Sequence, residues 1–410
     1  MVGILWGLFG CAMIILASIL LSENKKEINI RTVTIGFILQ VVFGFLVLRW
    51  ETGKNILQFV SGGINDLINF GHEGIAFVFG SLSDREGPVG HIFAINVLGM
   101  IIFLTVLIAL LYHFGIMQYI VRIIGGFISK MMMTSYSESV AAAANIFVGN
   151  TQAPLVVKPY IANMSRSQIF SVMVGGLASV SGAVLVGLAA MGIPIEYLLS
   201  AAIMSAPAGL MIAKFLIPET EPINSKEWQI VNENMNENKE DTNVLDVIFE
   251  NSKEGLHYAI NIGLMLITLI GLIALVNGVL GWGGSLFGAG NLSLEFIFGY
   301  VFSPIAFIIG IPWNEAVVAG NLLAQKLLLN EFVAFASFST ELDNLSERTI
   351  AILTFALSGF ANFGAAGSIV GMLSRMVPER KKEIQKLAMK ALIAATLANL
   401  LNGAIVMVMM

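Results

Sequence analysis

The stretch Asn145-Ile-Phe-Val-Gly-Asn-Thr-Gln-Ala-Pro154 interrupts a long apolar run with a cluster of amide and hydroxyl side chains. A second interruption, Leu329-Asn-Glu-Phe-Val-Ala334, lies far along the chain and carries a carboxylate. Inside a bilayer such breaks persist only where protein or a water-filled cavity covers the freed backbone groups. We therefore predict two re-entrant helical hairpins, over residues 137–164 and 313–341, whose polar tips form a transport site. The alternative for each break is a polar kink that only packs helices.

The composition is that of a membrane protein. Of 410 residues, 57% are hydrophobic and 12% charged, whereas a soluble domain has roughly 25% charged residues. Apolar runs of about 20 residues, enough to span a bilayer, predict eight crossings, at residues 2–21, 32–49, 92–114, 168–192, 196–215, 257–280, 349–373 and 386–409. Residues 56–80, 116–132 and 292–310 mix apolar and charged side chains, as interfacial helices do. The expected fold class is therefore an all-α polytopic membrane protein.

Several function classes lack support in the sequence. It has no Ser-His-Asp or Cys-His set and no phosphate-binding loop, so we expect no enzyme. It has no basic patch interleaved with aromatic residues, so we expect no nucleic-acid partner. Cys11 is the single cysteine and the four histidines show no ligand spacing, which excludes an internal disulfide and a cysteine-based metal site.

The two halves of the chain repeat one another around an acidic, Asn-rich stretch at residues 219–254, which we interpret as a solvated linker. Each half has a crossing, an interfacial piece, a hairpin, a crossing broken by small residues and a last crossing. Three full crossings per unit is an odd number, so the repeats must be inverted in the membrane. Inverted repeats with discontinuous helices are how many secondary transporters build one site that opens alternately to either side.

Orientation follows from Lys and Arg near the ends of the predicted crossings. Positive charges cluster in three connections, which we therefore place in the cytoplasm: Lys25, Lys26 and Arg31; Arg122, Lys130, Lys158 and Arg166; and Arg375, Arg380, Lys381, Lys382 and Lys386. This topology leaves both termini outside, and the lipid bilayer is the expected environment.

The first tip offers Asn150, Thr151 and Gln152, which can all donate and accept hydrogen bonds and suit a neutral polar solute. The second tip adds Glu331. An intramembrane carboxylate is by default a functional-site hypothesis, because its desolvation costs at least about 2.5 kcal/mol. The alternative role of Glu331 is a structural ion pair with nearby Lys326.

Two further sets of residues are candidates. Phe360 and Asn362 lie at the break in the seventh crossing, where a ring can stack on a flat solute and an amide can bind hydroxyls. A sodium ion prefers hard oxygen ligands. The predicted sodium site, which we call the sodium cage, consists of Asn145, Val148, Thr151, Ser179 and Val180. The alternatives are packing for the phenylalanine, and for the Ser and Thr hydroxyls a bond to their own helix. Glu138 and Glu315 open the hairpins and are expected to cap helices.

The linked motifs Gly149-Asn-Thr-Gln-Ala-Pro, Pro312-Trp-Asn-Glu-Ala, Asn330-Glu-Phe-Val-Ala and Gly359-Phe-Ala-Asn-Phe resemble those of the concentrative nucleoside transporters, over nearly the whole chain. The resemblance implies a homotrimer in which a scaffold holds a transport domain that moves like an elevator, driven by a sodium or proton gradient. It also implies that Asn150, Thr151 and Gln152 face the nucleobase and that Val184 lines its pocket. It further implies that Glu331 and Asn362 bind ribose hydroxyls, with Phe360 against the nucleoside.

The same resemblance divides the chain into five parts. These are scaffold helices with the first interfacial helix (1–115), the first transport-domain repeat with hairpin 1, broken helix 4 and helix 5 (116–215), the acidic cytoplasmic linker (216–254), scaffold helix 6 (255–290), and the second transport-domain repeat with hairpin 2, broken helix 7 and helix 8 (291–410).

The sequence departs from the family pattern at both tips. The usual Gly-Gln-Thr-Glu is Gly149-Asn-Thr-Gln here, and Phe-Ala-Asn-x-Ser-Ser has become Phe360-Ala-Asn-Phe-Gly-Ala. We therefore expect a sodium-coupled nucleoside importer of a bacterial inner membrane, with its base preference shifted toward other purine or modified nucleosides. The alternatives are a carrier of free nucleobases or another small polar solute, proton coupling through Glu331, and a passive channel.

Overall fold

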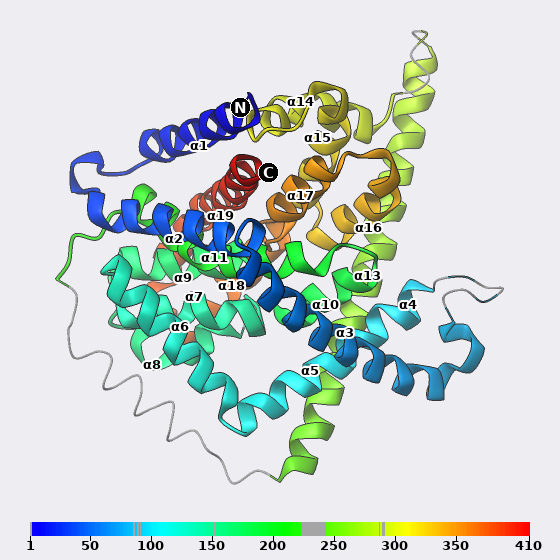
Figure 1. The fold of residues 1–410 in the computed structure, drawn as a ribbon, viewed down its shortest axis with the longest axis horizontal. Coiled ribbons are helices and arrows are strands. Elements are labelled where there is room, and N and C mark those ends of the chain that lie inside the picture. Colours follow the sequence, from blue (N-terminus) through cyan, green and yellow to red (C-terminus); the bar gives the residue numbers. More distant parts are fainter. Residues whose placement is uncertain are drawn as a thin grey trace.

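The structure, a computed structural model, describes residues 2–84, 87, 90, 92–150, 152–222, 243–286, 288 and 292–410. Its helices are shown in Figure 1. In chain order they are α1 (Val2–Leu20), α2 (Ile30–Leu48), α3 (Glu51–Phe79), α4 (Phe93–Asn96), α5 (Leu98–His113), α6 (Ile116–Met132), α7 (Tyr136–Val148), α8 (Lys158–Ile161), α9 (Arg166–Ala178), α10 (Gly182–Ala190), α11 (Ile195–Leu216), α13 (Val244–Ser285), α14 (Leu294–Ile308), α15 (Trp313–Leu328), α16 (Glu331–Glu341), α17 (Glu347–Leu357), α18 (Phe363–Met376) and α19 (Lys381–Met409).

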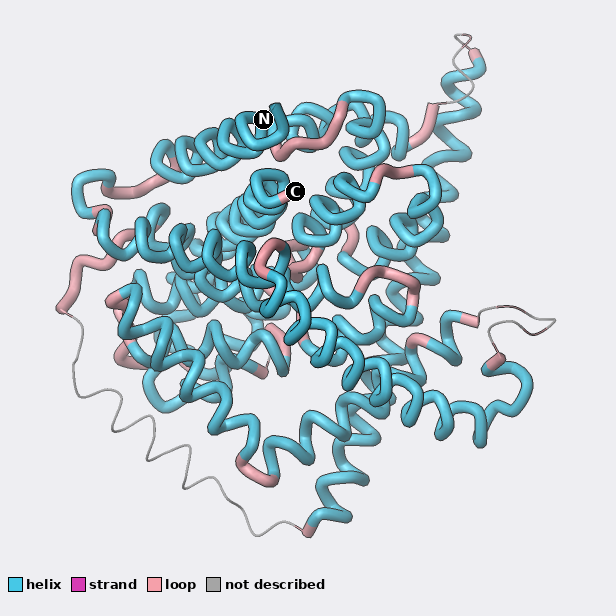
Figure 2. The backbone as a smooth tube through the Cα atoms, viewed as in Figure 1, coloured by secondary structure: helices cyan, strands magenta, loops and turns pink. Residues whose placement is uncertain are grey.

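Short 3-10 helices join several of these elements: η1 (Lys25–Glu27), η2 (Gly80–Ser83), η3 (Ala153–Val157), η4 (Leu342–Asn344) and η5 (Pro378–Arg380). Within the described residues the chain is helix and loop, with no strand (Figure 2). The all-α polytopic fold expected from the sequence is confirmed.

Seven described segments are helical, long and apolar enough to cross a membrane, and they coincide with seven of the eight predicted crossings. The other predicted crossing, residues 349–373, is divided into α17 and α18 by a break at residues 358–362. By length α14 and α15 together would pass as one more span, but they are bent by 112°. That bend agrees with an interfacial helix followed by the first arm of a hairpin.

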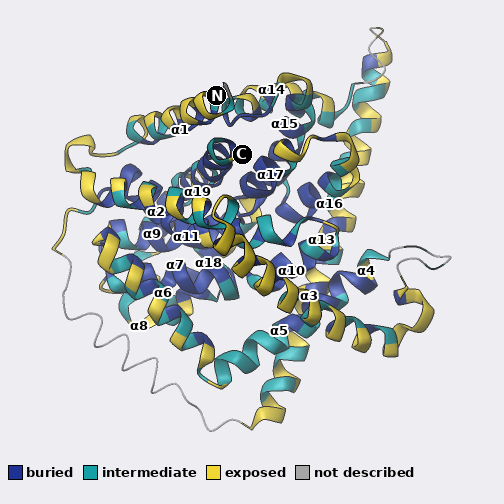
Figure 3. Cartoon of the chain, in the orientation of Figure 1, coloured by how far each residue is buried: buried dark blue, intermediate teal, exposed yellow. Residues whose placement is uncertain are grey.

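The helices after the first tip form the centre of the molecule. The span of α9 and α10 is 94% buried inside the protein and that of α11 is 89% buried, whereas α13 is only 17% buried. Figure 3 shows the same division, with buried residues in α7, α9, α11, α17 and α19 and exposed ones along α1, α3 and α13. The outer apolar helices therefore have the surface that lipid or another subunit would cover.

The two repeats have the same register at their caps. Ser165 begins α9 and Ser346 begins α17, each accepting a hydrogen bond from a backbone N–H of its own first turn. After the breaks, Ser181 begins α10 and Asn362 begins α18 in the same way. Both pairs differ in number by 181 (346 minus 165, and 362 minus 181). The breaks are therefore equivalent positions of one repeated unit.

A buried ion pair fixes the first hairpin to the centre. Glu138 closes a capping box with Ser135 at the start of α7, as the sequence predicted. The Glu138 carboxylate also lies 2.8 Å from the Lys214 ammonium on α11, and both side chains are buried. Lys214 is 3.3 Å from Glu219 as well and donates to Ser167 Oγ at 3.0 Å. The start of α7 is thus held by charge as well as by packing.

The long helix α13 runs along one edge of the molecule (Figure 1). It begins at Val244, so residues 244–254, which the composition places in the acidic linker, are helical. Residues 223–242 of that stretch lie outside the described residues. Glu254 therefore belongs to a helix that faces the rest of the protein.

Candidate functional site

The first tip, Gly149–Gln152, is a sharp break. The helix α7 ends at Val148, and Gly149 has φ = 93°, a conformation that side chains other than glycine rarely adopt. A Cβ atom added there would also lie 3.1 Å from Ser181 Cβ. Pro154 then starts η3, since proline is tolerated in a first helical turn. Thr151, predicted for both the base site and the sodium cage, lies outside the described residues.

The second tip, Leu329–Glu331, has a capped break. The helix α15 ends at Leu328, and Asn330 caps α16 by accepting a hydrogen bond from Val333 N at 2.8 Å. Glu331 is then the first residue of α16 and is 5% exposed. At that position the positive end of the helix dipole stabilises a carboxylate.

Glu331 and Asn362 meet directly. Asn362 Nδ2 donates to Glu331 Oε2 at 3.0 Å, while its Oδ1 accepts from Ala365 N at 2.8 Å and so caps α18. These two bonds assign the orientation of the amide. The cap of a broken helix thus holds the carboxylate of the opposite tip in place.

A cavity of about 1340 Å³ lies against both tips. Of the residues predicted to bind substrate, it is lined by Asn150, Gln152, Glu331, Phe360 and Asn362. The structure therefore brings the two tips and the break of the seventh crossing to one space.

Val184 is placed differently. It is fully buried on α10 and is not among the cavity's lining residues. Its neighbours Ser181 and Ala183 line the cavity instead. Val184 therefore lies behind the cavity wall in this structure.

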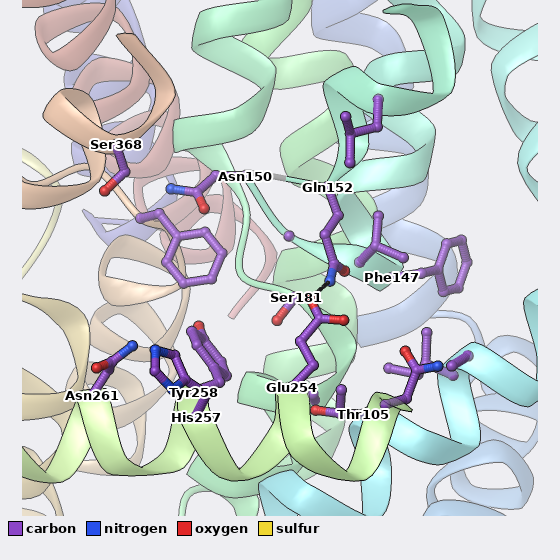
Figure 4. Close-up of a pocket in the computed structure, with 18 of the residues that line it drawn as sticks. Thr105, Phe147, Asn150, Gln152, Ser181, Glu254, His257, Tyr258, Asn261 and Ser368 are labelled. Carbon is purple, nitrogen blue, oxygen red and sulfur yellow. Dashed lines mark hydrogen bonds between the residues drawn. The ribbon is translucent and has the colours of Figure 1, made fainter. Parts of the chain in front are cut away.

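One face of α13 forms the opposite wall, which the sequence did not reveal. The lining residues on this face recur every three or four positions, as expected of one helix face: Asn243, Val247, Asn251, Glu254, Tyr258, Asn261 and Met265. Figure 4 shows Glu254, Tyr258 and Asn261 extending from this helix toward the first tip. The spacing of Asn, Glu and Tyr at every third or fourth position could have predicted this wall from the sequence. It begins, however, within the polar stretch that we interpreted as a linker.

Both tips contact this wall. Gln152 Nε2 donates to Glu254 Oε1 at 2.9 Å (Figure 4). Asn330 Nδ2 donates to Met265 Sδ at 2.8 Å. The bond to Glu254 leaves Gln152 Oε1 as the free acceptor of that amide.

One predicted sodium ligand, Asn145, joins the first hairpin to the broken helix. Asn145 is fully buried, and its Nδ2 donates to Gly175 O at 2.9 Å and Gly176 O at 3.4 Å. Its Oδ1 is buried with no hydrogen-bond donor. A buried orphan oxygen is costly unless something fills its lone pairs, and a cation does this.

Three of the other four residues of the sodium cage lie in the part of the chain that the structure describes. Ser179 and Val180 are buried at the break between α9 and α10, where Ser179 Oγ donates to Val180 O at 3.1 Å. Val148 lines the cavity at the end of α7. An amide oxygen, a hydroxyl and backbone carbonyls are the hard, neutral ligands that suit a small monovalent ion.

Lys326 does not form the ion pair considered as an alternative role for Glu331. No carboxylate of the described residues lies within 4.0 Å of its ammonium, which donates instead to Ala356 O at 3.0 Å and Asn399 Oδ1 at 2.5 Å. The second tip therefore keeps its carboxylate for the cavity.

Three family models together cover most of the chain. Residues 197–407 match the model described as the C-terminus of the Na+ dependent nucleoside transporters, and residues 9–82 match the N-terminus of the same group. Residues 94–194 match a model described as nucleoside recognition. The chain belongs to the sodium-dependent nucleoside transporter family. The resemblance noted in the sequence is confirmed.

Relatives of this transporter are similar over almost their full length. The chain is 48% identical over 403 residues to the uncharacterized transporter YutK of Bacillus subtilis, covering 98% of each chain. It is 43% identical over 410 residues to the nucleoside permease NupC of Helicobacter pylori, covering 98% of this chain and 96% of that one. These relatives are transporters and permeases, not enzymes, in agreement with the missing catalytic sets.

Solved structures share this fold. The structure of CNTnw in an inward-facing substrate-bound state superposes with a TM-score of 0.94 at 44% identity, covering 99% of this chain and 98% of that one. A variant of the same protein in an outward-facing state gives 0.93 at 44% identity, covering 99% and 97%.

Proposed function

We propose that this chain is a sodium-coupled importer of nucleosides in a bacterial inner membrane. The observation that carries the proposal is the convergence of both hairpin tips on one cavity, with a buried carboxylate at one tip and a buried, unpartnered amide oxygen beside the other. Family membership supports sodium and a nucleoside as the cargo.

Each end of a nucleoside has matching groups in the cavity. The ribose presents vicinal hydroxyls, which donate well to a carboxylate, and Glu331 lies within the cavity wall with Asn362 bonded to it. The base presents amide-like edges, which suit Asn150 and Gln152. Phe360 provides an aromatic surface between these groups. Thr151 and Val184 remain predicted contacts of the base.

Sodium is proposed to bind with the nucleoside and to organise the first tip. A cation beside Asn145 Oδ1 would fix the end of α7 relative to the break at Ser179. Because Asn145 Nδ2 already bonds to the carbonyls of α9, the ion would complete a link between hairpin and broken helix. A nucleoside would then find Asn150 and Gln152 already positioned, which lowers the entropic cost of binding.

Alternating access is proposed to occur by an elevator movement. Among the residues that the structure describes, two side-chain bonds join the tips to α13, Gln152 to Glu254 and Asn330 to Met265. These could be exchanged for others as the repeats 116–215 and 291–410 move along the scaffold helices. The inverted topology and the placement of both termini outside belong to the same proposal and are supported by the distribution of Lys and Arg. The homotrimer is carried over from the family resemblance.

In this topology the cavity opens to the cytoplasm, since it extends to Asn243 at the start of α13. Its volume exceeds the roughly 300 to 1,000 Å³ of common ligand sites. We interpret the excess as an exit passage continuous with the binding site.

Uptake by purified protein in liposomes tests the proposal. We expect labelled nucleoside to accumulate against its gradient when sodium is higher outside, at fixed pH, and competition by uridine, cytidine, adenosine, inosine and uracil to rank the substrates. Accumulation driven by a pH gradient without sodium would favour proton coupling. Stronger competition by uracil than by uridine would favour a nucleobase carrier, and non-saturating flux would favour a channel. An unaltered uridine and cytidine preference would refute the proposed shift toward other purine or modified nucleosides.

A further inference from the structure

The constant difference of 181 between the repeats gives each residue of the sodium cage a counterpart. Asn145 corresponds to Lys326 (326 minus 145), and each lies in the last turn of the first arm of its hairpin. Each side chain also donates to a carbonyl 30 residues later in the sequence, Gly175 for Asn145 and Ala356 for Lys326. The two side chains therefore make the same bridge, from hairpin to broken helix, in the two repeats.

The two hydroxyl side chains of the cage have no equivalent in the second repeat. The counterpart of Ser179 is Phe360, and the counterpart of Thr151 is Phe332. Both phenylalanines are buried and line the cavity. Their aromatic carbon atoms supply no oxygen ligand for a sodium ion.

In the second repeat, the basic side chain of Lys326 occupies the position that corresponds to Asn145 in the first. The Lys326 side chain is buried, with a residue exposure of 3%, and its ammonium donates to two neutral oxygens, Ala356 O and Asn399 Oδ1. Asn399 Nδ2 in turn donates to Ala178 O at 2.5 Å and to Ser358 O at 3.4 Å.

The location favours positive charge. Ala178 ends α9, and Ser358 follows the last residue of α17, so the C-terminal ends of the two half-helices meet at Asn399. The C-terminal end of a helix dipole carries partial negative charge, which a cation stabilises.

We propose that the Lys326 ammonium is a tethered cation that permanently takes, in the second repeat, the place of the sodium ion bound by the first. This inference rests on the proposed sodium coupling. The break between α17 and α18 then stays assembled with or without sodium, whereas the break between α9 and α10 is completed only when sodium binds. Of the two related sites, only the one in the first repeat binds and releases a cation, so one sodium ion is transported in each cycle.

Wild-type protein provides the first test. Sodium and nucleoside fluxes into proteoliposomes are measured as a ratio from the reversal potential. The expected result is one sodium per nucleoside, with non-sigmoidal dependence on sodium. A ratio of two, with sigmoidal dependence, would overturn the tethered-cation proposal. Uptake without any sodium dependence would instead overturn the proposed sodium coupling, so the two failures are distinguishable.

Variants of Lys326 provide the second test. Thermal unfolding in detergent is followed with and without sodium for wild type, Lys326→Met, Lys326→Arg and Lys326→Asn. We expect Lys326→Met to unfold several degrees lower, and Lys326→Arg to unfold nearer to wild type because it keeps the charge. Lys326→Asn also removes the charge, and because the phenylalanines supply no oxygen ligand, added sodium should raise its unfolding temperature no more than that of wild type. Equal stability of Lys326→Met and wild type would refute the proposal.

Discussion

Glu331 is buried, begins α16 and accepts a hydrogen bond from Asn362, so we expect nucleoside binding to depend on it. We expect Glu331→Gln to weaken nucleoside binding by about tenfold to a hundredfold, because a hydrogen bond to a charged group contributes about 1.5–3 kcal/mol. Equilibrium binding of labelled nucleoside to purified protein measures the change. The control is Glu341→Gln at the other end of α16, which should bind like wild type. Equal affinities for both variants would remove Glu331 from the site.

The second prediction at this scale concerns Asn145 and the sodium requirement of uptake. Asn145→Ala removes the buried oxygen that has no donor, so we expect the sodium concentration for half-maximal uptake to rise by at least about tenfold, which corresponds to about 1.4 kcal/mol. Sodium titration of uptake at saturating nucleoside tests this.

The matched control is Asn402→Ala. Asn402 is also fully buried with an unpartnered Oδ1, but it lies on α19 and donates to Ser205. The control should lose stability without changing the sodium requirement. If the two variants shift the sodium titration equally, the predicted cage is in the wrong place.

The sequence predicted the residues of the tips because each stands out from its surroundings. Asn150, Gln152 and Glu331 are polar groups within apolar runs, and all three line the cavity. Glu254 could not be found this way, because it follows a stretch already rich in Asn and Glu. The role of Glu254 depends on which face of α13 lies against the first tip, and packing rather than local composition decides that.

At the scale of elements, the buried pair Glu138–Lys214 ties α7 to α11. We expect Glu138→Gln to lower the free energy of unfolding by about 1.5–3 kcal/mol, since Lys214 loses its fully buried carboxylate partner and keeps only the more exposed Glu219. Thermal or denaturant unfolding measures it. The exposed pair Lys253–Glu250 supplies the control, because Glu250→Gln should cost no more than about 1 kcal/mol. Lys214→Met combined with Glu138→Gln should recover much of the loss; a double variant as unstable as the single one would contradict this account.

The broken helices themselves could be predicted well. Small residues and caps such as Ser165, Ser181 and Ser346 mark starts and breaks locally, and the structure has breaks where the sequence predicted them. The beginning of α13 could not be predicted, because a helix that starts in polar solvent-exposed sequence has no change of hydropathy at its first residue. The five-part domain division stays a prediction.

At the scale of the whole molecule, the contact between Gln152 and Glu254 joins one repeat to α13. A Gln152→Cys, Glu254→Cys protein should lose uptake when a short bifunctional thiol reagent links the two positions, and regain it when the link is cleaved. A reagent is needed because two long side chains in contact hold their Cβ atoms too far apart for a direct disulfide. The native Cys11 is buried and should not react.

The controls are the two proteins with one substitution each, treated with the same reagent; because Gln152 is a proposed contact of the base, the loss caused by the link is measured relative to their uptake. Uptake that continues in the linked protein would show that the first tip works without moving relative to α13. This relation between distant parts of the chain is what the sequence cannot express, because it depends on how helices pack after they form.

The depth of the cavity has an electrical consequence. Within the predicted crossing 257–280 its wall on α13 runs from His257 to Met265, about 12 Å at 1.5 Å per residue, against a hydrocarbon thickness of about 30 Å. Water and mobile ions in such a space conduct, so the voltage across the bilayer falls mainly over the packed layer beyond Glu331. A cation crossing that layer gains or loses up to about 2.3 kcal/mol per 100 mV. Uptake of an uncharged nucleoside should therefore follow imposed potassium diffusion potentials.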